Sequence, residues 1–128
     1  MEKYMKENIE MRYKKESIIM NLELDELRIV EEYGPFRFCE WIEIKDDYCL
    51  SVQCGVGKYS IPRENVDLDQ YTHFELAFIY EGSLSNRHDE LLKGFNRKEE
   101  LQEYKEGTVY MYVPKDLIDD LYNYFMHN

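Results

Sequence analysis

The spacing of apolar and polar positions changes along the chain. Residues 3–19 place apolar side chains at roughly helical spacing with charged residues between them, which predicts a helix. Residues 22–33 (LELDELRIVEEY) fit either a helix or the start of a strand, so both elements remain open there. Gly34-Pro35 ends this segment, because proline can continue neither a helix nor a central strand.

From residue 36 onward the period is two, which is typical of strands. In residues 36–44 (FRFCEWIEI) one face would carry Phe36, Phe38, Glu40, Ile42 and Ile44, and the other Arg37, Cys39, Trp41 and Glu43. Residues 48–54 (YCLSVQC) alternate in the same way, and the polar residues KDD lie between the two runs. Two alternating runs around a short polar break predict a β-hairpin.

Further elements follow in the second half of the chain. Residues 72–82 (THFELAFIYEG) have apolar groups on both faces, which indicates a central strand. Residues 97–104 (RKEELQEY) predict a short exposed helix, and residues 108–113 (TVYMYV) predict another strand. Residues 114–125 (PKDLIDDLYNYF) predict a helix that begins at a proline and presents one apolar stripe to the sheet.

This order of elements predicts an α+β fold. We expect a mainly antiparallel sheet of about four to five strands, packed by the C-terminal helix. Residues 1–20 would form an N-terminal helical arm, and residues 21–128 a single acidic α+β domain.

Charge limits the choice of partners. The net charge is −11: residues 1–20 carry five Lys/Arg and four Asp/Glu (+1), and the other 108 residues carry 11 and 23 (−12). Such a body repels nucleic acid and anionic membranes and attracts basic proteins. Solubility alone is the other explanation of the acidic charge.

The chain has no apolar stretch near the ~20 residues of a membrane span, and no apolar signal core. Three cysteines without framework spacing fit reduced thiols, so we expect a cytoplasmic protein.

The stretch QCGVGKYSIPRE (residues 53–64) resembles a phosphate-binding loop at first sight. The P-loop pattern fails, because valine stands where its first glycine belongs, tyrosine follows the lysine, and a proline lies where a helix should begin. Turn formation explains the glycines. A phosphate or nucleotide messenger held by converging backbone N–H groups remains an alternative. The residues that would form this ligand site are Gly55, Gly57, Lys58, Ser60 and Arg63.

Metal binding and catalysis receive no support from the spacing of reactive residues. The three histidines are scattered and none has a partner at ligand spacing. Cys49 and Ser60 have no paired histidine in the sequence. We therefore expect no metal, no cofactor and no enzymatic activity.

Two carboxylates stand at positions that the pattern assigns to the interior. Glu40 interrupts an apolar face and Glu75 lies within the expected central strand. A buried carboxylate needs a partner. We expect an ion pair between Arg63 and Glu75 that anchors the glycine loop to the sheet; exposure of Glu75 at a sheet edge is the alternative.

Three fragments carry a resemblance to other proteins: YSIPRE (Tyr59–Glu64), FELAF (Phe74–Phe78) and VYMYVPKDLI (Val109–Ile118). In order and spacing they resemble small uncharacterised proteins encoded by phages and prophages of low-GC Gram-positive bacteria. The resemblance implies an origin in a mobile element. It adds weight to inhibitors of host defence, a class to which small acidic phage proteins often belong.

Acidic clusters provide the remaining candidate site. Carboxylates spread over one face could enter the basic channel of a nucleic-acid-binding protein, with tyrosines stacking between them. The candidate partner-binding residues are Glu40, Glu43, Asp46, Asp47, Glu64, Asp67, Asp69, Tyr48 and Tyr71. The sequence thus favours a non-catalytic anti-defence inhibitor, of the anti-CRISPR or anti-restriction kind, with a basic partner such as a nuclease. An immunity or antitoxin-like module and a homo-oligomer stay open.

Overall fold

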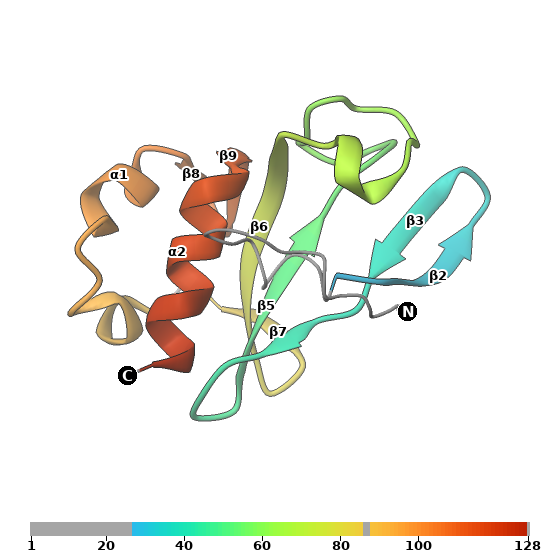
Figure 1. Ribbon diagram of the computed structural model, residues 1–128. Coiled ribbons are helices and arrows are strands. Elements are labelled where there is room, and N and C mark those ends of the chain that lie inside the picture. Colours follow the sequence, from blue (N-terminus) through green and yellow to red (C-terminus); the bar gives the residue numbers. More distant parts are fainter. Residues whose placement is uncertain (1–26, 86–87, 128) are drawn as a thin grey trace.

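A computed structural model of the protein describes residues 27–85 and 88–127 and has an α+β fold (Figure 1). The helical arm expected at residues 1–20 lies outside the described residues. In chain order the elements are β2 (Ile29–Tyr33), β3 (Phe36–Cys39), β4 (Ile42–Glu43), β5 (Tyr48–Gln53), η2 (Leu68–Gln70), β6 (His73–Tyr80), β7 (Ser83–Ser85), η3 (Asp89–Leu92), α1 (Lys98–Gln102), β8 (Lys105–Glu106), β9 (Val109–Pro114) and α2 (Lys115–Met126).

The larger sheet is antiparallel, and β6 lies at its centre. Its strand order is β4-β5-β6-β9-β8, and β7 also pairs with β6. Leu76 of β6 lies opposite Val52 of β5 on one side and Tyr110 of β9 on the other. The prediction of a central strand at residues 72–82 is therefore confirmed, and it followed from apolar groups on both faces of that segment.

The predicted β-hairpin around KDD is confirmed only for its inner part. β4 pairs with β5, and Asp46 and Asp47 make the turn in the left-handed region, with φ of 53° and 67°. The prediction of one continuous strand over residues 36–44 is wrong, because the run divides into β3 and β4. β3 pairs instead with β2 in a separate two-stranded sheet, so residues 29–33 form a strand and not a helix.

This division reverses the expected faces of β3. Phe36 and Phe38 are 40% and 38% exposed, whereas Cys39 is buried. Since neighbouring side chains of a strand point to opposite sides, turning Cys39 inward turns the two phenylalanines outward. The β2–β3 hairpin consequently presents aromatic surface to solvent.

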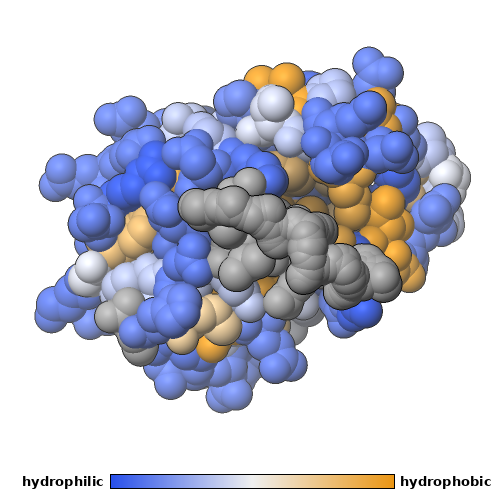
Figure 2. All heavy atoms as spheres, viewed as in Figure 1, coloured by the Kyte–Doolittle hydropathy of each residue, from blue (hydrophilic) through white to orange (hydrophobic). Residues whose placement is uncertain are grey.

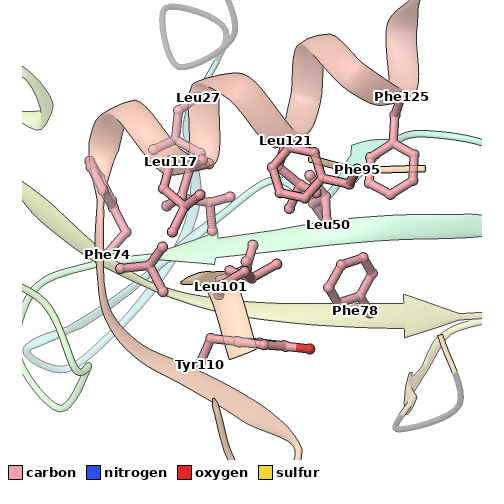
Figure 3. Packing of buried hydrophobic residues seen from close by; sticks show 14 of the residues in the cluster. Leu27, Leu50, Phe74, Phe78, Phe95, Leu101, Tyr110, Leu117, Leu121 and Phe125 are labelled. Carbon is pink, nitrogen blue, oxygen red and sulfur yellow. The ribbon is translucent and has the colours of Figure 1, made fainter. Parts of the chain in front are cut away.

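Helix α2 covers one face of the large sheet, as its apolar stripe predicts. Figure 3 shows Leu117, Leu121 and Phe125 of α2 directed toward Leu50 of β5 and Phe78 of β6. All five side chains are buried, and burying a leucine or phenylalanine contributes about 1.5–3 kcal/mol to folding. The core therefore lies between α2 and this face, and the opposite face of β5 and β6 is left to form other surfaces.

The predicted short helix at residues 97–104 is also confirmed, as α1. Among the residues that the structure describes, none of the helices is both long enough and apolar enough to span a membrane.

Candidate functional site

A groove of about 650 Å³ lies on the face of the sheet that α2 does not cover. Its floor is made by alternate residues of the two central strands, Ser51 and Gln53 of β5 with Glu75 and Ile79 of β6. These positions point away from the core because their neighbours Leu50, Val52, Leu76 and Phe78 point into it. The strand period thus produces a core on one face and a groove on the other.

Apolar side chains line the groove and remain open to solvent. Val30 is 59% exposed, Phe38 38%, Trp41 46% and Leu84 57%. They come from β2, β3, the residues between β3 and β4, and β7. Figure 2 shows apolar atoms (orange) gathered on the part of the surface where Figure 1 places the β2–β3 hairpin. Exposed apolar groups collected in one hollow are typical of a binding surface.

The charged groups of the groove are mainly carboxylates. Glu31, Glu40, Glu43 and Glu75 line it together with a single lysine, Lys58. The lysine is engaged inside the protein: its Nζ donates to the Arg37 carbonyl at 2.9 Å and lies 4.2 Å from the centre of the Phe38 ring. Glu40 pairs with Arg28 at the surface. The groove therefore combines an apolar lining with a predominantly negative border.

The glycine loop that follows β5 is held by bonds within the protein. The backbone N–H groups of Gly55, Val56 and Tyr59 donate to Ser60 Oγ at 3.0 Å, to Asn65 Oδ1 at 3.2 Å and to Glu75 Oε1 at 3.0 Å. Those of Lys58 and Ser60 donate to the carbonyls of Gly55 and Lys58. An anion-binding nest needs its N–H groups to point at the ligand, whereas these five N–H groups are bonded within the protein.

The expected ion pair between Arg63 and Glu75 is wrong, although Glu75 does anchor the loop. Arg63 Nε donates to the Lys58 carbonyl at 2.9 Å, and its guanidinium lies 5.0 Å from the centre of the Tyr59 ring. Glu75 instead accepts from the Tyr59 N–H. A backbone N–H without a strand partner needs an acceptor, and Glu75 supplies it from the adjacent strand.

The candidate acidic residues lie in two separate places. Figure 1 places the β4–β5 turn, with Asp46 and Asp47, and the segment 61–72 at opposite ends of β5. Glu64, Asp67 and Asp69 belong to that second segment and are exposed. One continuous acidic face is therefore not formed by the full candidate set. Only Glu40 and Glu43 among these carboxylates reach the groove.

The two candidate tyrosines have structural partners. Tyr48 packs against Tyr80, with ring centres 4.7 Å apart and ring planes inclined by 41°. Tyr71 is 2% exposed, and its hydroxyl donates to the Glu64 carbonyl and accepts from Arg37 and Val66. The expectation of Tyr71 in a partner surface is therefore wrong, because its hydroxyl is used to fix the segment 61–72 to β3.

Two of the reactive side chains, His88 and Ser60, are buried in the structure. In residues 27–85 and 88–127, no three His, Cys, Asp or Glu side chains lie where they could hold a metal ion. His88 is buried against Phe78, and its Nε2 lies 2.6 Å from the Tyr110 hydroxyl. Ser60 is fully buried and donates to the Pro62 carbonyl.

Sequence reasoning missed the apolar lining of the groove. The sequence pattern places Phe38 and Trp41 on opposite faces of one strand, and it leaves the structure around Val30 open between helix and strand. The available signal was the high apolar content on both faces of residues 36–44, which exceeds what one buried face needs.

A comparison of the chain with protein-family models, curated proteins and solved structures found no match.

Proposed function

We propose that the protein is a non-catalytic binding protein that holds a basic, partly apolar segment of a partner protein in this groove. The observation that carries the proposal is the combination of four solvent-exposed apolar side chains with four carboxylates around one hollow. The exposed apolar side chains would supply affinity, because binding of the partner removes them from water. The carboxylates select lysine and arginine over acidic residues.

The charge of the whole chain supports a basic partner. A net charge of −11 accelerates encounter with a positive surface and opposes encounter with nucleic acid. Nucleic-acid-binding proteins, including the nucleases of host defence, are a class that presents such positive surfaces. The resemblance to phage-encoded proteins favours inhibition of a protein of this class.

The single tryptophan of the chain makes the groove directly observable. Trp41 lines the groove, so its fluorescence changes when a ligand covers it. We would titrate the full chain with a peptide of alternating lysine and leucine, and with a matched peptide of alternating glutamate and leucine. The proposal expects saturable binding of the basic peptide alone, weakening as salt shortens the Debye length from ~8 Å at physiological ionic strength to ~3 Å at 1 M.

A pair of matched charge reversals separates a local site from a general charge effect. Glu31→Lys with Glu43→Lys changes the groove, whereas Asp67→Lys with Asp69→Lys makes the same change in net charge at two residues that do not line it. We expect a loss of about tenfold or more in affinity for the first pair and a change within about twofold for the second. Equal losses in both variants, or no fluorescence response to the basic peptide, would overturn the proposal.

A further inference from the structure

Two cysteine thiols meet beneath the β2–β3 hairpin. Cys39 is the last residue of β3, and Cys54 directly follows β5. Both are buried, at 5% and 2% exposure, and both are free thiols. The two thiols lie within hydrogen-bonding reach of each other. The two thiols are therefore neighbours that are not covalently joined.

Backbone contacts hold the two cysteines together independently of the thiols. The side-chain amide of Gln53, the residue before Cys54, bonds both backbone groups of Cys39, at 2.8 Å to its N–H and 3.0 Å to its carbonyl. Lys58 Nζ reinforces this attachment by bonding the Arg37 carbonyl on β3. A disulfide forms only where the backbone already brings the two Cβ atoms close, and these bonds keep β3 beside the end of β5.

The surroundings of the pair favour Cys39 as the nucleophile, because Cys39 lines the groove and lies near two cations. The hydrogen bond with Cys54 lowers the pKa of Cys39, burial opposes this, and the nearby cations Arg37 and Lys58 lower it further. The same hydrogen bond and burial raise the pKa of Cys54. Thiolate is the reactive form. Cys39 also lines the groove, which gives a small oxidant a route to the sulfur that is easier to ionise.

We propose that Cys39 and Cys54 are a redox-active pair that closes to an intramolecular disulfide with a hydroperoxide as the oxidant. The Cys39 thiolate attacks one oxygen of hydrogen peroxide, the O–O bond breaks, and the released hydroxide takes a proton to become water. Cys39 is then a sulfenic acid. The sulfur of Cys54 attacks the sulfenic sulfur, the S–O bond breaks, and the leaving hydroxide takes the Cys54 proton as a second water. In total the two thiols lose two hydrogens and hydrogen peroxide becomes two waters.

The disulfide joins the β2–β3 hairpin covalently to the large sheet. In the reduced protein, side-chain hydrogen bonds attach the backbone of β3 to Gln53 of β5 and to Lys58 of the loop that follows. A bond between residues 39 and 54 encloses the β4–β5 hairpin in a closed loop, which restricts the unfolded chain and raises the melting temperature of the oxidised protein. This site does not depend on the proposed partner binding.

Cys49 provides the matched control. It also lines the groove and is only partly buried, yet burial and the Glu43 carboxylate raise its pKa, and no described cysteine is shown bonded to it. The Cys49→Ser variant retains the proposed pair. Cys39→Ser and Cys54→Ser each remove one half of it, and circular dichroism would establish that each variant is folded.

The test is oxidation of the full chain with hydrogen peroxide, followed by alkylation of remaining thiols, intact mass and peptide mapping. We expect a monomer that loses the mass of two hydrogens, a peptide crosslinked between residues 39 and 54, and full reversal by dithiothreitol. Cys49→Ser should behave as the natural chain does. Oxidation of Cys49 alone, intermolecular dimers, or conversion of Cys39 to sulfinic acid without a crosslink would overturn the proposal.

Discussion

The side chain of Gln53 pairs with the backbone of Cys39 as a neighbouring strand would. Its Oε1 accepts from the Cys39 N–H at 2.8 Å, and its Nε2 donates to the Cys39 carbonyl at 3.0 Å. Nε2 also donates to Ser51 Oγ at 3.0 Å. A buried backbone N–H and carbonyl both require partners. The Gln53 amide thereby supplies hydrogen-bond partners to both backbone groups of Cys39 and joins the β2–β3 hairpin to the large sheet.

Replacement of Gln53 by leucine should destabilise the protein and release the hairpin. The change leaves two buried backbone groups of Cys39 unpaired, at a cost of about 1–3 kcal/mol each when no water replaces the partner. We expect the free energy of unfolding in urea to fall by about 2–4 kcal/mol, and the Cys39 amide to exchange its hydrogen faster. Gln102→Leu, at an exposed position of α1, is the control. Equal stability of the two variants would show that the Gln53 amide carries no such role.

Gly55 should tolerate alanine less well than Gly82 does. Both glycines have positive φ, 106° and 89°, so alanine is strained at either position. A Cβ on Gly55 would come within 2.5 Å of Asn65 Oδ1, whereas a Cβ on Gly82 has nothing within 4 Å. Strain alone costs about 1–2 kcal/mol, and we expect Gly55→Ala to lose about 1–3 kcal/mol beyond Gly82→Ala in urea unfolding. Similar losses would mean that the loop moves freely around Asn65.

Burial of His88 should make the protein less stable in mild acid. Burial lowers the pKa of His88 below its ordinary 6.5, Lys105 lowers it further, and Asp89 and the Ser85 backbone oppose the shift. The unfolded chain therefore binds the proton more tightly. The contribution of neutral His88 to the free energy of unfolding is fully present above pH 6.5. It is lost as the pH falls through the pKa that His88 has in the folded protein.

A substitution isolates this contribution. Between about pH 7 and about pH 5, His88→Gln should lose less of its own free energy of unfolding than the natural chain does. His127→Gln, at the exposed end of α2, should keep the natural slope. An unchanged slope in His88→Gln would assign the acid sensitivity to other groups.

The sequence pattern was sufficient to predict an element where burial of its apolar side chains dominates its stability. The apolar stripe of α2 and the two apolar faces of β6 predicted both elements and their packing, because burial of those side chains dominates their stability. The turn of the β4–β5 hairpin was predictable for a local reason as well. Three consecutive polar residues, KDD, follow an alternating run, and aspartate adopts the left-handed conformation more readily than most residues.

The pattern failed where contacts between distant residues replace local rules. Alternation over residues 36–44 predicts one strand. In the structure the Gln53 amide bonds the backbone of Cys39 at the end of β3, and Cys39 points inward. The sequence predicts that an ion pair of Glu75 with Arg63 anchors the glycine loop, whereas in the structure Glu75 bonds the Tyr59 N–H. Its partner could not be deduced, because a free backbone N–H at Tyr59 arises only from the path of the folded loop. The groove escaped prediction for the same reason, since its lining comes from segments that are far apart in the sequence.

Arg97 should couple α1 to α2 through a network of carboxylates. Its guanidinium bonds Glu100 through two nitrogens, at 2.9 and 2.8 Å, and reaches Asp120 and Asp116 on α2 at 2.6 and 3.2 Å. We expect Arg97→Ala to lower the free energy of unfolding by about 1 kcal/mol at low salt, and less at 1 M sodium chloride, because exposed ion pairs are modest and screened. Arg97→Lys keeps the charge but cannot bond Glu100 through two nitrogens, so it should lose about half as much. A loss in Arg97→Ala that persists unchanged at high salt would assign the role of this side chain to packing of its methylene groups.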